Sequence, residues 1–222
     1  GRIYGVEFDA EVIDTTFALP GLRRHVCRIV RGQVEEGESV TATIDTEARN
    51  ATRRNHTGTH VLHWALRTVL GEHVKQAGSM VSPERLRFDF SHYAAVTPEE
   101  IRRIEELANR EVLGNSGVDA FETSKDEALA AGAIAFFGDK YGDTVRVLRA
   151  GSSVELCGGT HVSATGDIGT IKIVSEGSIG SNLRRIEAVT GENAVAWMQS
   201  SDATLGTVAS LVGTKHDEVV AG

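Results

Sequence analysis

The chain has 222 residues, 41% hydrophobic and 24% charged, enough for one large or two small globular domains. No apolar run approaches the roughly 20 residues of a membrane span, and no secretory signal is present, so we expect a cytoplasmic protein without a membrane partner. The net charge of −8 argues against a general nucleic-acid binder, but residues 49–91 carry seven basic residues against three acidic ones.

The N-terminal half predicts strands followed by a long helix. Residues 1–45 alternate apolar and polar side chains between turn-forming sequences, which predicts three or four antiparallel strands in a small barrel or partial barrel. Residues 46–71 have the periodicity of one long helix. Two strands are expected over 74–82 and 85–91, joined by a Pro-Glu turn.

The C-terminal half predicts a mixture of helices and strands. A second helix is expected from Thr97 to about residue 113, because Thr97 is a good N-cap and is followed by proline and two glutamates. A short third helix is expected over 124–132, and the chain from 191 onward reads as helical. Further strands are expected in VRVLR, TIKIVSEG and LRRIEAVTG. We therefore predict an α+β fold with helices on one face of a mainly antiparallel sheet.

The two cysteines have different settings. Cys27 lies in an apolar, strand-like stretch, and we interpret it as a buried structural thiol. Cys157 lies in ELCGGTH, where it is four residues before His161 and is followed by two glycines, so a tight loop is expected. An isolated cysteine pair is no disulfide framework, which agrees with an intracellular protein.

A pair of histidines on the predicted long helix suggests a metal site. His56 and His60 are four residues apart in RNHTGTH, the spacing that presents two imidazoles to one ion. Thr57 stands where a metalloprotease of the HExxH type would need its glutamate, which argues against proteolysis. On a helical wheel these histidines, with His63, lie opposite the apolar stripe, so we expect them to face away from the core. A solvated polar face is the alternative.

Together, the two short motifs predict a zinc-binding site. HxxxH alone is unspecific, but HxxxH combined with CGGTH is a much rarer pattern. Three imidazoles and one thiolate match the donor preference of zinc. The sequence therefore predicts one shared metal site, with these ligands: His56, His60, Cys157 and His161.

Four stretches carry a resemblance to a known family: RNHTGTHVLHWALR, HVKQAGSMVSPERLRFDFSH, ELCGGTHVSATGDIG and RRIEAVTGENA. Together they resemble the editing domain of alanyl-tRNA synthetase. Freestanding AlaX-type editing proteins share the pattern, and the threonyl-tRNA synthetase editing domain shares its sparse core. The resemblance implies a barrel-like subdomain over 1–45, a zinc-dependent editing core over 46–190 and the start of a C-terminal helical linker over 191–222. With the missing initiator methionine, it favours a synthetase fragment, linked in the parent chain to aminoacylation and C-terminal domains.

The resemblance also implies an activity and a partner. The chain is expected to hydrolyse the ester of Ser-tRNA(Ala) and Gly-tRNA(Ala), because a pocket built for alanine discriminates poorly against glycine and serine. We expect zinc to orient and polarise the substrate while a nearby water attacks it, with Cys157 essential. Thr59 is expected at the substrate side chain, and Gln76 is expected to line the pocket.

Several assignments are less specific. Five basic residues are candidates for tRNA phosphates, and a surface salt bridge is the alternative for each: Arg53, Arg54, Lys75, Arg184 and Arg185. His63 and His73 are left out of the metal site, and His92 is interpreted as structural. Gly58 stands where the family commonly has alanine, which is expected to widen the pocket slightly or to be neutral.

Two rival functions remain open. The chain could be a module that binds tRNA without cleaving it, metal-free or with a structural zinc. It could also be a freestanding trans-editing hydrolase or a threonyl-type editing domain. Deacylation of Ser-tRNA(Ala) separates the first rival from the editing hypothesis.

Overall fold

The computed structural model describes residues 1–134, 142–215 and 218–219, and the chain divides into two compact units, 1–49 and 50–222. The boundary falls in the first turns of α1 (Thr46–Leu70), the long helix that the sequence predicts. In the described part of the chain, no helix is both long enough and apolar enough to cross a membrane. Helices and antiparallel sheets together make the α+β fold that was expected.

Unit 1 is an antiparallel sheet of four strands in the order β3-β2-β1-β4. The strands are β1 (Arg2–Tyr4), β2 (Asp9–Leu19), β3 (Leu22–Arg31) and β4 (Thr41–Thr43). The sheet is open, with β3 and β4 as its two edges, so of the barrel or partial barrel that was expected, the closed form is excluded. The physical reason is length: β1 and β4 have three residues each, too few to carry the sheet round to β3.

The buried core of unit 1 is small. Among its described hydrophobic residues, Phe8 and Ala10 are buried, while many side chains of the β2–β3 hairpin are exposed. Cys27, on edge strand β3, is a free thiol and is half-buried, which corrects the prediction of a buried one. An edge strand of a thinly covered sheet has too little packing around it to bury that side chain.

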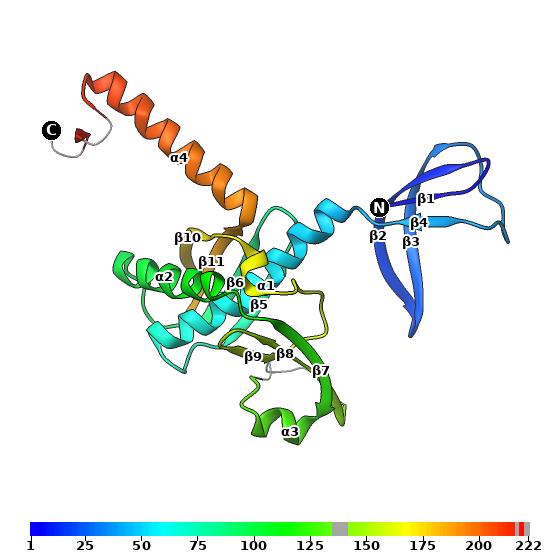
Figure 1. Ribbon diagram of the computed structural model, residues 1–222, viewed down its shortest axis with the longest axis horizontal. Helices are drawn as coiled ribbons and strands as arrows, with labels where there is room; N and C mark the ends of the chain where they lie inside the picture. The colour runs from blue at the N-terminus through cyan, green and yellow to red at the C-terminus, as the bar shows by residue number, and fades with distance from the viewer. Residues whose placement is uncertain (135–141, 216–217, 220–222) are drawn as a thin grey trace. The chain divides into compact units, whose positions relative to one another are not determined.

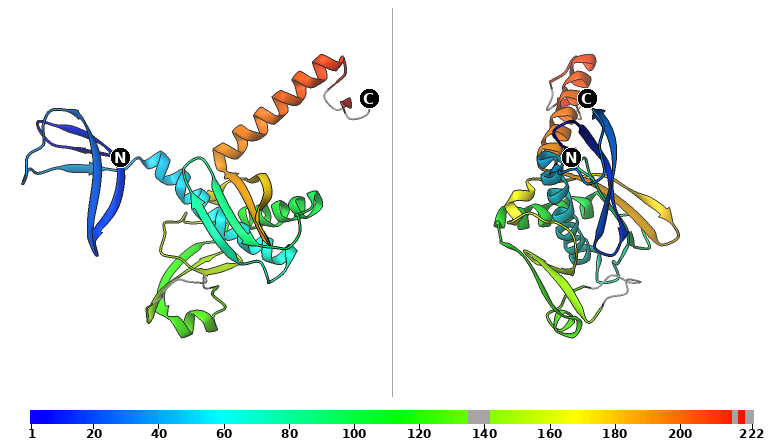
Figure 2. Two further views of the ribbon diagram at one scale, coloured as in Figure 1. Left: turned by 180° about the vertical axis from the view of Figure 1, so that it is seen from behind. Right: turned by 90° about the vertical axis from the view of Figure 1, so that its right-hand side faces the viewer.

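Unit 2 is built on a second antiparallel sheet, ordered β10-β11-β6-β5. Its strands are β5 (Gln76–Val81), β6 (Leu86–Ser91), β10 (Ile171–Gly180) and β11 (Leu183–Thr190). Alternate residues of this sheet share one core with α1 and with α2 (Pro98–Gly114), which lie against it in Figures 1 and 2. Leu62 of α1, Phe88 of β6 and Ile104 of α2 are all fully buried there.

A smaller sheet, ordered β7-β8-β9, carries α3 (Lys125–Ala130) and a second apolar cluster. Its strands are β7 (Val118–Ser124), β8 (Thr144–Ala150) and β9 (Ser153–Leu156). Strands β7 and β9 were not predicted. The backbone of Ile134 flanks β9, donating to Val154 O and accepting from Leu156 N, each at 3.0 Å. Strand β9 leads directly into the CGGTH segment, which the structure leaves as a loop.

The helix ends follow the sequence signals. Helix α2 starts with a capping box between Thr97 and Glu100 and ends at Asn115, whose backbone is left-handed with φ 47°. Helix α3 has its own capping box, from Ser124. After the short 3-10 turn η1 (Thr165–Ile168) and strands β10 and β11, α4 (Gly191–Val212) extends away from the sheet (Figure 2).

Candidate metal centre

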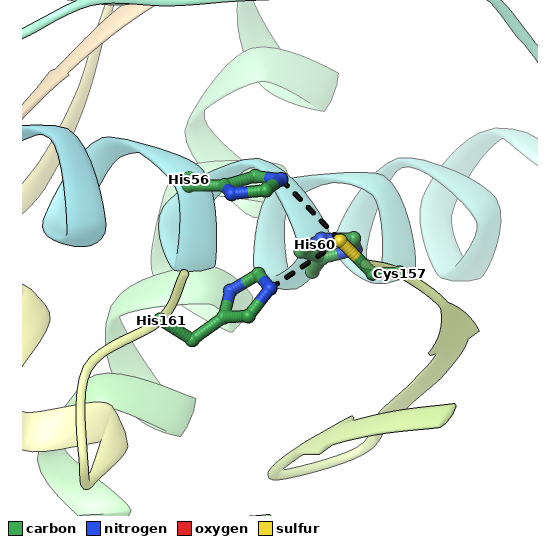
Figure 3. Close-up of side chains that lie close together, drawn as sticks. All are labelled: His56, His60, Cys157 and His161. Carbon is green, nitrogen blue, oxygen red and sulfur yellow. Dashed lines mark hydrogen bonds between the residues drawn. The ribbon is translucent and has the colours of Figure 1, made fainter. Parts of the chain in front are cut away.

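Two distant segments place four donor side chains together. Helix α1 supplies His56 and His60, and the loop after β9 supplies Cys157 and His161 (Figure 3). One ligand atom from each of the four lies within 4.8 Å of all the others. The two sequence motifs, about a hundred residues apart, therefore meet at one point.

The distances from Cys157 to two of the histidines suit a tetrahedral ion. The Sγ atom of Cys157 lies 3.5 Å from Nε2 of His56 and 3.3 Å from Nε2 of His161 (Figure 3). A zinc tetrahedron with nitrogen and sulfur ligands has donor–donor edges of about 3.4–3.8 Å. His60 contributes a buried Nε2 without a hydrogen-bond partner among the described residues. A buried imidazole nitrogen left in this way fits a ligand to a metal.

Two of the three histidines on α1, His60 and His63, are buried, which corrects the prediction that they face away from the core, while His56 is half-buried. The exposed fractions are 4% for His60 and 1% for His63. The helical wheel assumed a single packing surface, but α1 has two. One face packs on the sheet that contains β6, and the other contacts Glu155 of β9.

Glu155 makes that second face polar. Its Oε2 lies 2.5 Å from Nδ1 of His60, and its Oε1 lies 2.7 Å from Nδ1 of His63. Burial alone would lower the pKa of His60, but the charge and the hydrogen bond of Glu155 raise it. The same pairing lowers the pKa of Glu155 in spite of its own burial. A cation bound at His60 Nε2 would take the place of a proton there.

A hydroxyl group holds the loop histidine. Thr57 donates its hydroxyl hydrogen to the carbonyl of Arg53 at 2.9 Å. Its oxygen accepts from the backbone N–H of Val162 at 3.2 Å and lies 3.3 Å from Nδ1 of His161. Because the single hydroxyl hydrogen is already used, Nδ1 of His161 must be the donor. When a metal ion replaces the hydrogen on Nε2, the lone pair of that nitrogen faces the ion beside Cys157.

The electrostatics of the loop favour a thiolate. Burial would raise the pKa of Cys157, but hydrogen bonds with His161 and His56 and the charge of His60 lower it to about 3. The backbone N–H of Gly159 also points at Sγ, at 3.5 Å. A thiolate with neutral imidazoles is the protonation state that zinc binding requires.

Arg146 and Gly159 shape this loop. Nη1 of Arg146, on β8, donates to the carbonyls of Cys157 and Gly159 at 2.9 and 2.8 Å. A β-carbon on Gly159 would lie 2.1 Å from a ring carbon of His56, whereas one on Gly158 would meet nothing within 4 Å. The two glycines therefore differ in their role: Gly159 has to be a glycine for the loop to contact the helix, whereas Gly158 does not.

The expected substrate residues lie outside the donor cluster. Thr59 is buried on α1 and donates its hydroxyl to the carbonyl of Asn55 at 2.8 Å, which leaves its oxygen lone pairs as acceptors. Gln76 is half-buried at the start of β5, opposite Phe90. Gly58 faces the core, where an added β-carbon would lie 3.0 Å from the Thr190 methyl group. The next nearest atoms to that β-carbon belong to Ile168 and Leu86, each at 3.6 Å.

The basic candidates fall into two groups. Two of them form bidentate ion pairs with N–O distances of 2.6–2.8 Å: Arg184 pairs with Glu176, and Arg185 pairs with Asp89. Arg53 and Arg54, on α1 just before His56, have buried Nε atoms without hydrogen-bond partners among the described residues. Lys75 is exposed.

The other singled-out histidines form a separate pair. Nε2 of His73 lies 2.8 Å from Nδ1 of His92, and both rings contact Tyr93. His92 is buried. The pair is not among the four grouped donors.

Sequence reasoning missed three residues that support the donors: Glu155, Thr57 and Arg146. Glu155 sits inside the quoted ELCGGTH motif, so an acid two residues before the cysteine was an available signal. Thr57 was also in view, between the two histidines. Arg146 had no local signal, because its contacts depend on the pairing of β8 with β9.

Part of the chain matches a family of known proteins. Residues 145–187 match the family described as the second additional domain of threonyl and alanyl tRNA synthetases. That match spans β8, β9, the CGGTH loop, β10 and part of β11. It therefore includes two of the four donors.

The whole chain is similar to proteins named alanine–tRNA ligase. It is 49% identical to the one from Pelotomaculum thermopropionicum over 221 residues, which is 99% of this chain and 25% of that protein. It is 47% identical to the one from Chloroflexus aurantiacus over 233 residues, 99% of this chain and 26% of that protein. The ligase from Desulforamulus reducens is 46% identical over 97% of this chain. The chain thus spans about a quarter of the length of these relatives.

Proposed function

We propose, from the premise that this chain is homologous to a segment of alanyl-tRNA synthetases, that it is an editing hydrolase acting at a zinc centre. Its substrates would be Ser-tRNA(Ala) and Gly-tRNA(Ala), whose ester bond it cleaves. The observation that carries the proposal is the convergence of His56, His60, Cys157 and His161. The alanine–tRNA ligase relatives supply the link to tRNA(Ala).

The need for a second site follows from the chemistry of the amino acids. A synthesis pocket for alanine admits the smaller glycine, and serine differs by a single hydroxyl. Pocket fit for such differences discriminates only about 10- to 200-fold. An editing site must therefore hydrolyse the esters of glycine and serine, which the synthesis pocket fails to exclude, and leave the alanine ester intact.

The donor residues fit zinc by their chemistry and by their protonation. His60 and His161 each have Nδ1 engaged, by Glu155 and by Thr57, which leaves Nε2 for the ion. Cys157 is held as a thiolate. When bound, zinc acts as a Lewis acid that polarises an ester carbonyl or holds an amino group.

Thr59 is the proposed selector of serine. Its hydroxyl hydrogen is fixed on the carbonyl of Asn55, so its oxygen can accept a hydrogen bond from the substrate. Serine can donate such a bond and alanine cannot. Gln76 is the proposed second contact, holding the substrate or the attacking water.

Arg53 and Arg54 are the better candidates for tRNA phosphates. Neither side chain pairs with a carboxylate among the described residues, whereas Arg184 and Arg185 are already neutralised by carboxylates. Positive charge on α1, one turn before His56, would hold the acceptor end of tRNA against that helix.

Deacylation of three substrates tests this proposal. The chain loaded with zinc is mixed with Ser-, Gly- and Ala-tRNA(Ala), and the ester remaining is followed in time. We expect loss of the first two and survival of the third. Cys157→Ala should abolish the activity. Cys27→Ala removes the chain's other thiol, which lies in unit 1, and should leave the activity unchanged.

A non-catalytic structural site is the competing function, and one observation favours it: four protein ligands close a zinc tetrahedron, as structural sites do. In that case the chain would bind one zinc and retain Ser-tRNA(Ala) without cleaving it. That result would overturn the editing proposal.

A further inference from the structure

Glu155 is a buried carboxylate next to the four donors but is not one of them. Its carboxylate is buried between two histidines of α1 that lie one turn apart, and each oxygen faces one ring. Among the described residues, the two oxygens contact His60, His63 and, more weakly, Ser153 at 3.4 Å. A buried carboxylate without good partners is costly, so these imidazole N–H groups are what stabilises it.

The two hydrogen bonds fix the chemical form of the rings. An ionised carboxylate only accepts, so both Nδ1 atoms that face it must carry hydrogen. In a neutral imidazole the other nitrogen then has the free lone pair. For His60 that nitrogen is Nε2, the buried atom without a hydrogen-bond partner among the described residues.

Glu155 also joins the two halves of the donor set. It lies on β9 two residues before Cys157, and it contacts the helix that carries His60. The next strand residue, Leu156, is held by the backbone of Ile134 at 3.0 Å. The carboxylate thus ties a fixed strand to the helix at the point where the loop and the helix supply their ligands.

We propose that Glu155 is a positioning residue of the metal centre: it fixes the tautomer and ring direction of His60 and sets the strand of Cys157 against α1, while His63 holds the second carboxylate oxygen. This rests on the proposed metal centre and adds to it a chain of contacts, His63–Glu155–His60. Outer partners of this kind typically change metal affinity about 10- to 100-fold.

Cobalt binding tests the proposal without reference to catalysis. Co²⁺ takes the place of zinc, and its visible absorption reports both affinity and ligand geometry. Glu155→Gln keeps the shape but offers a single amide oxygen, so it can accept from one of the two Nδ1–H groups and not from both. We expect the affinity for Co²⁺ to fall about 10- to 100-fold, with an altered absorption band.

Two further variants separate positioning from general stability. Glu105→Gln is the matched control: Glu105 bonds the Ile173 N–H and pairs with Lys172, so it is a cross-element glutamate outside the donor cluster. It should leave the cobalt affinity and spectrum unchanged. His63→Asn should weaken binding less than Glu155→Gln, because His60 keeps its carboxylate.

An NMR measurement covers the case in which Glu155→Gln fails to fold. In the zinc-loaded wild-type chain, ¹⁵N-labelled His60 should carry hydrogen on Nδ1, with Nε2 bound to the metal. Hydrogen on Nε2, or equal cobalt affinity and spectra in wild type and a folded Glu155→Gln, would overturn the role of Glu155 alone. A wild-type chain that binds no Co²⁺ would instead overturn the metal centre itself.

Discussion

Gly159 and His56 approach so closely that a β-carbon on the glycine would lie 2.1 Å from Cε1 of the imidazole and 2.7 Å from its Nδ1. The loop carrying Cys157 therefore contacts the helix carrying His56 with no room for a side chain. Gly158 next to it is open, with nothing within 4 Å of an added β-carbon. The two glycines form a matched pair for mutation.

Gly159→Ala should push the loop off the helix and separate the donors. Overpacking of this kind costs about 1–3 kcal/mol, and we expect it to appear mainly as weaker zinc binding, measured by competition with a chelator. Gly158→Ala should have little effect on the same measurement. Equal zinc affinity in the two variants would contradict the contact.

Thr57→Val should weaken metal binding about 10-fold, because it removes the oxygen that accepts from Val162 N and faces Nδ1 of His161. Thr57→Ser keeps that oxygen and should restore most of the affinity. The measurement is again a zinc titration. If valine and serine give the same affinity, the hydroxyl has no part in holding His161.

Arg146→Met should loosen the CGGTH loop, since its guanidinium bonds the carbonyls of Cys157 and Gly159. A bond from a charged donor contributes about 1.5–3 kcal/mol, so a clear loss of zinc affinity is expected. Arg149→Met is the control on the same strand; that side chain stacks over Phe121. An unaltered affinity in Arg146→Met would show that the loop keeps its shape without the arginine.

Thr59→Val should lower selectivity, so that the ratio of Ser-tRNA(Ala) to Ala-tRNA(Ala) hydrolysis falls. The loss of one hydrogen bond of about 1 kcal/mol corresponds to roughly fivefold. Thr68→Val provides the control, because Thr68 makes the same i−4 bond, to Trp64 O at 2.9 Å, further along α1. An unchanged ratio in Thr59→Val would remove Thr59 from substrate recognition.

The sequence predicted those features of the fold and site that depend on short stretches of neighbouring residues. The span of α1 follows from its periodicity, and the start of α2 follows from Thr97 and Glu100. The donor set was predicted from residue chemistry and spacing alone, and the structure brings those four side chains together.

What the sequence could not provide depends on contacts between distant segments. Strand β9 is four residues long, too short to show a period, yet it carries Glu155. The orientation of His60 and His63 was mispredicted because this strand gives α1 a second buried face. The N-terminal alternation predicted strands correctly but could not show that their sheet stays open.

Zinc titration of Ser-tRNA(Ala) deacylation tests the central claim most directly. The chain is stripped of metal, zinc is added back in steps, and the single-turnover rate is measured at each step. The account predicts a rate near zero without zinc that rises in proportion to it and levels off at one ion per chain. A stripped chain as fast as the reloaded one, or no deacylation at one bound zinc, would contradict it.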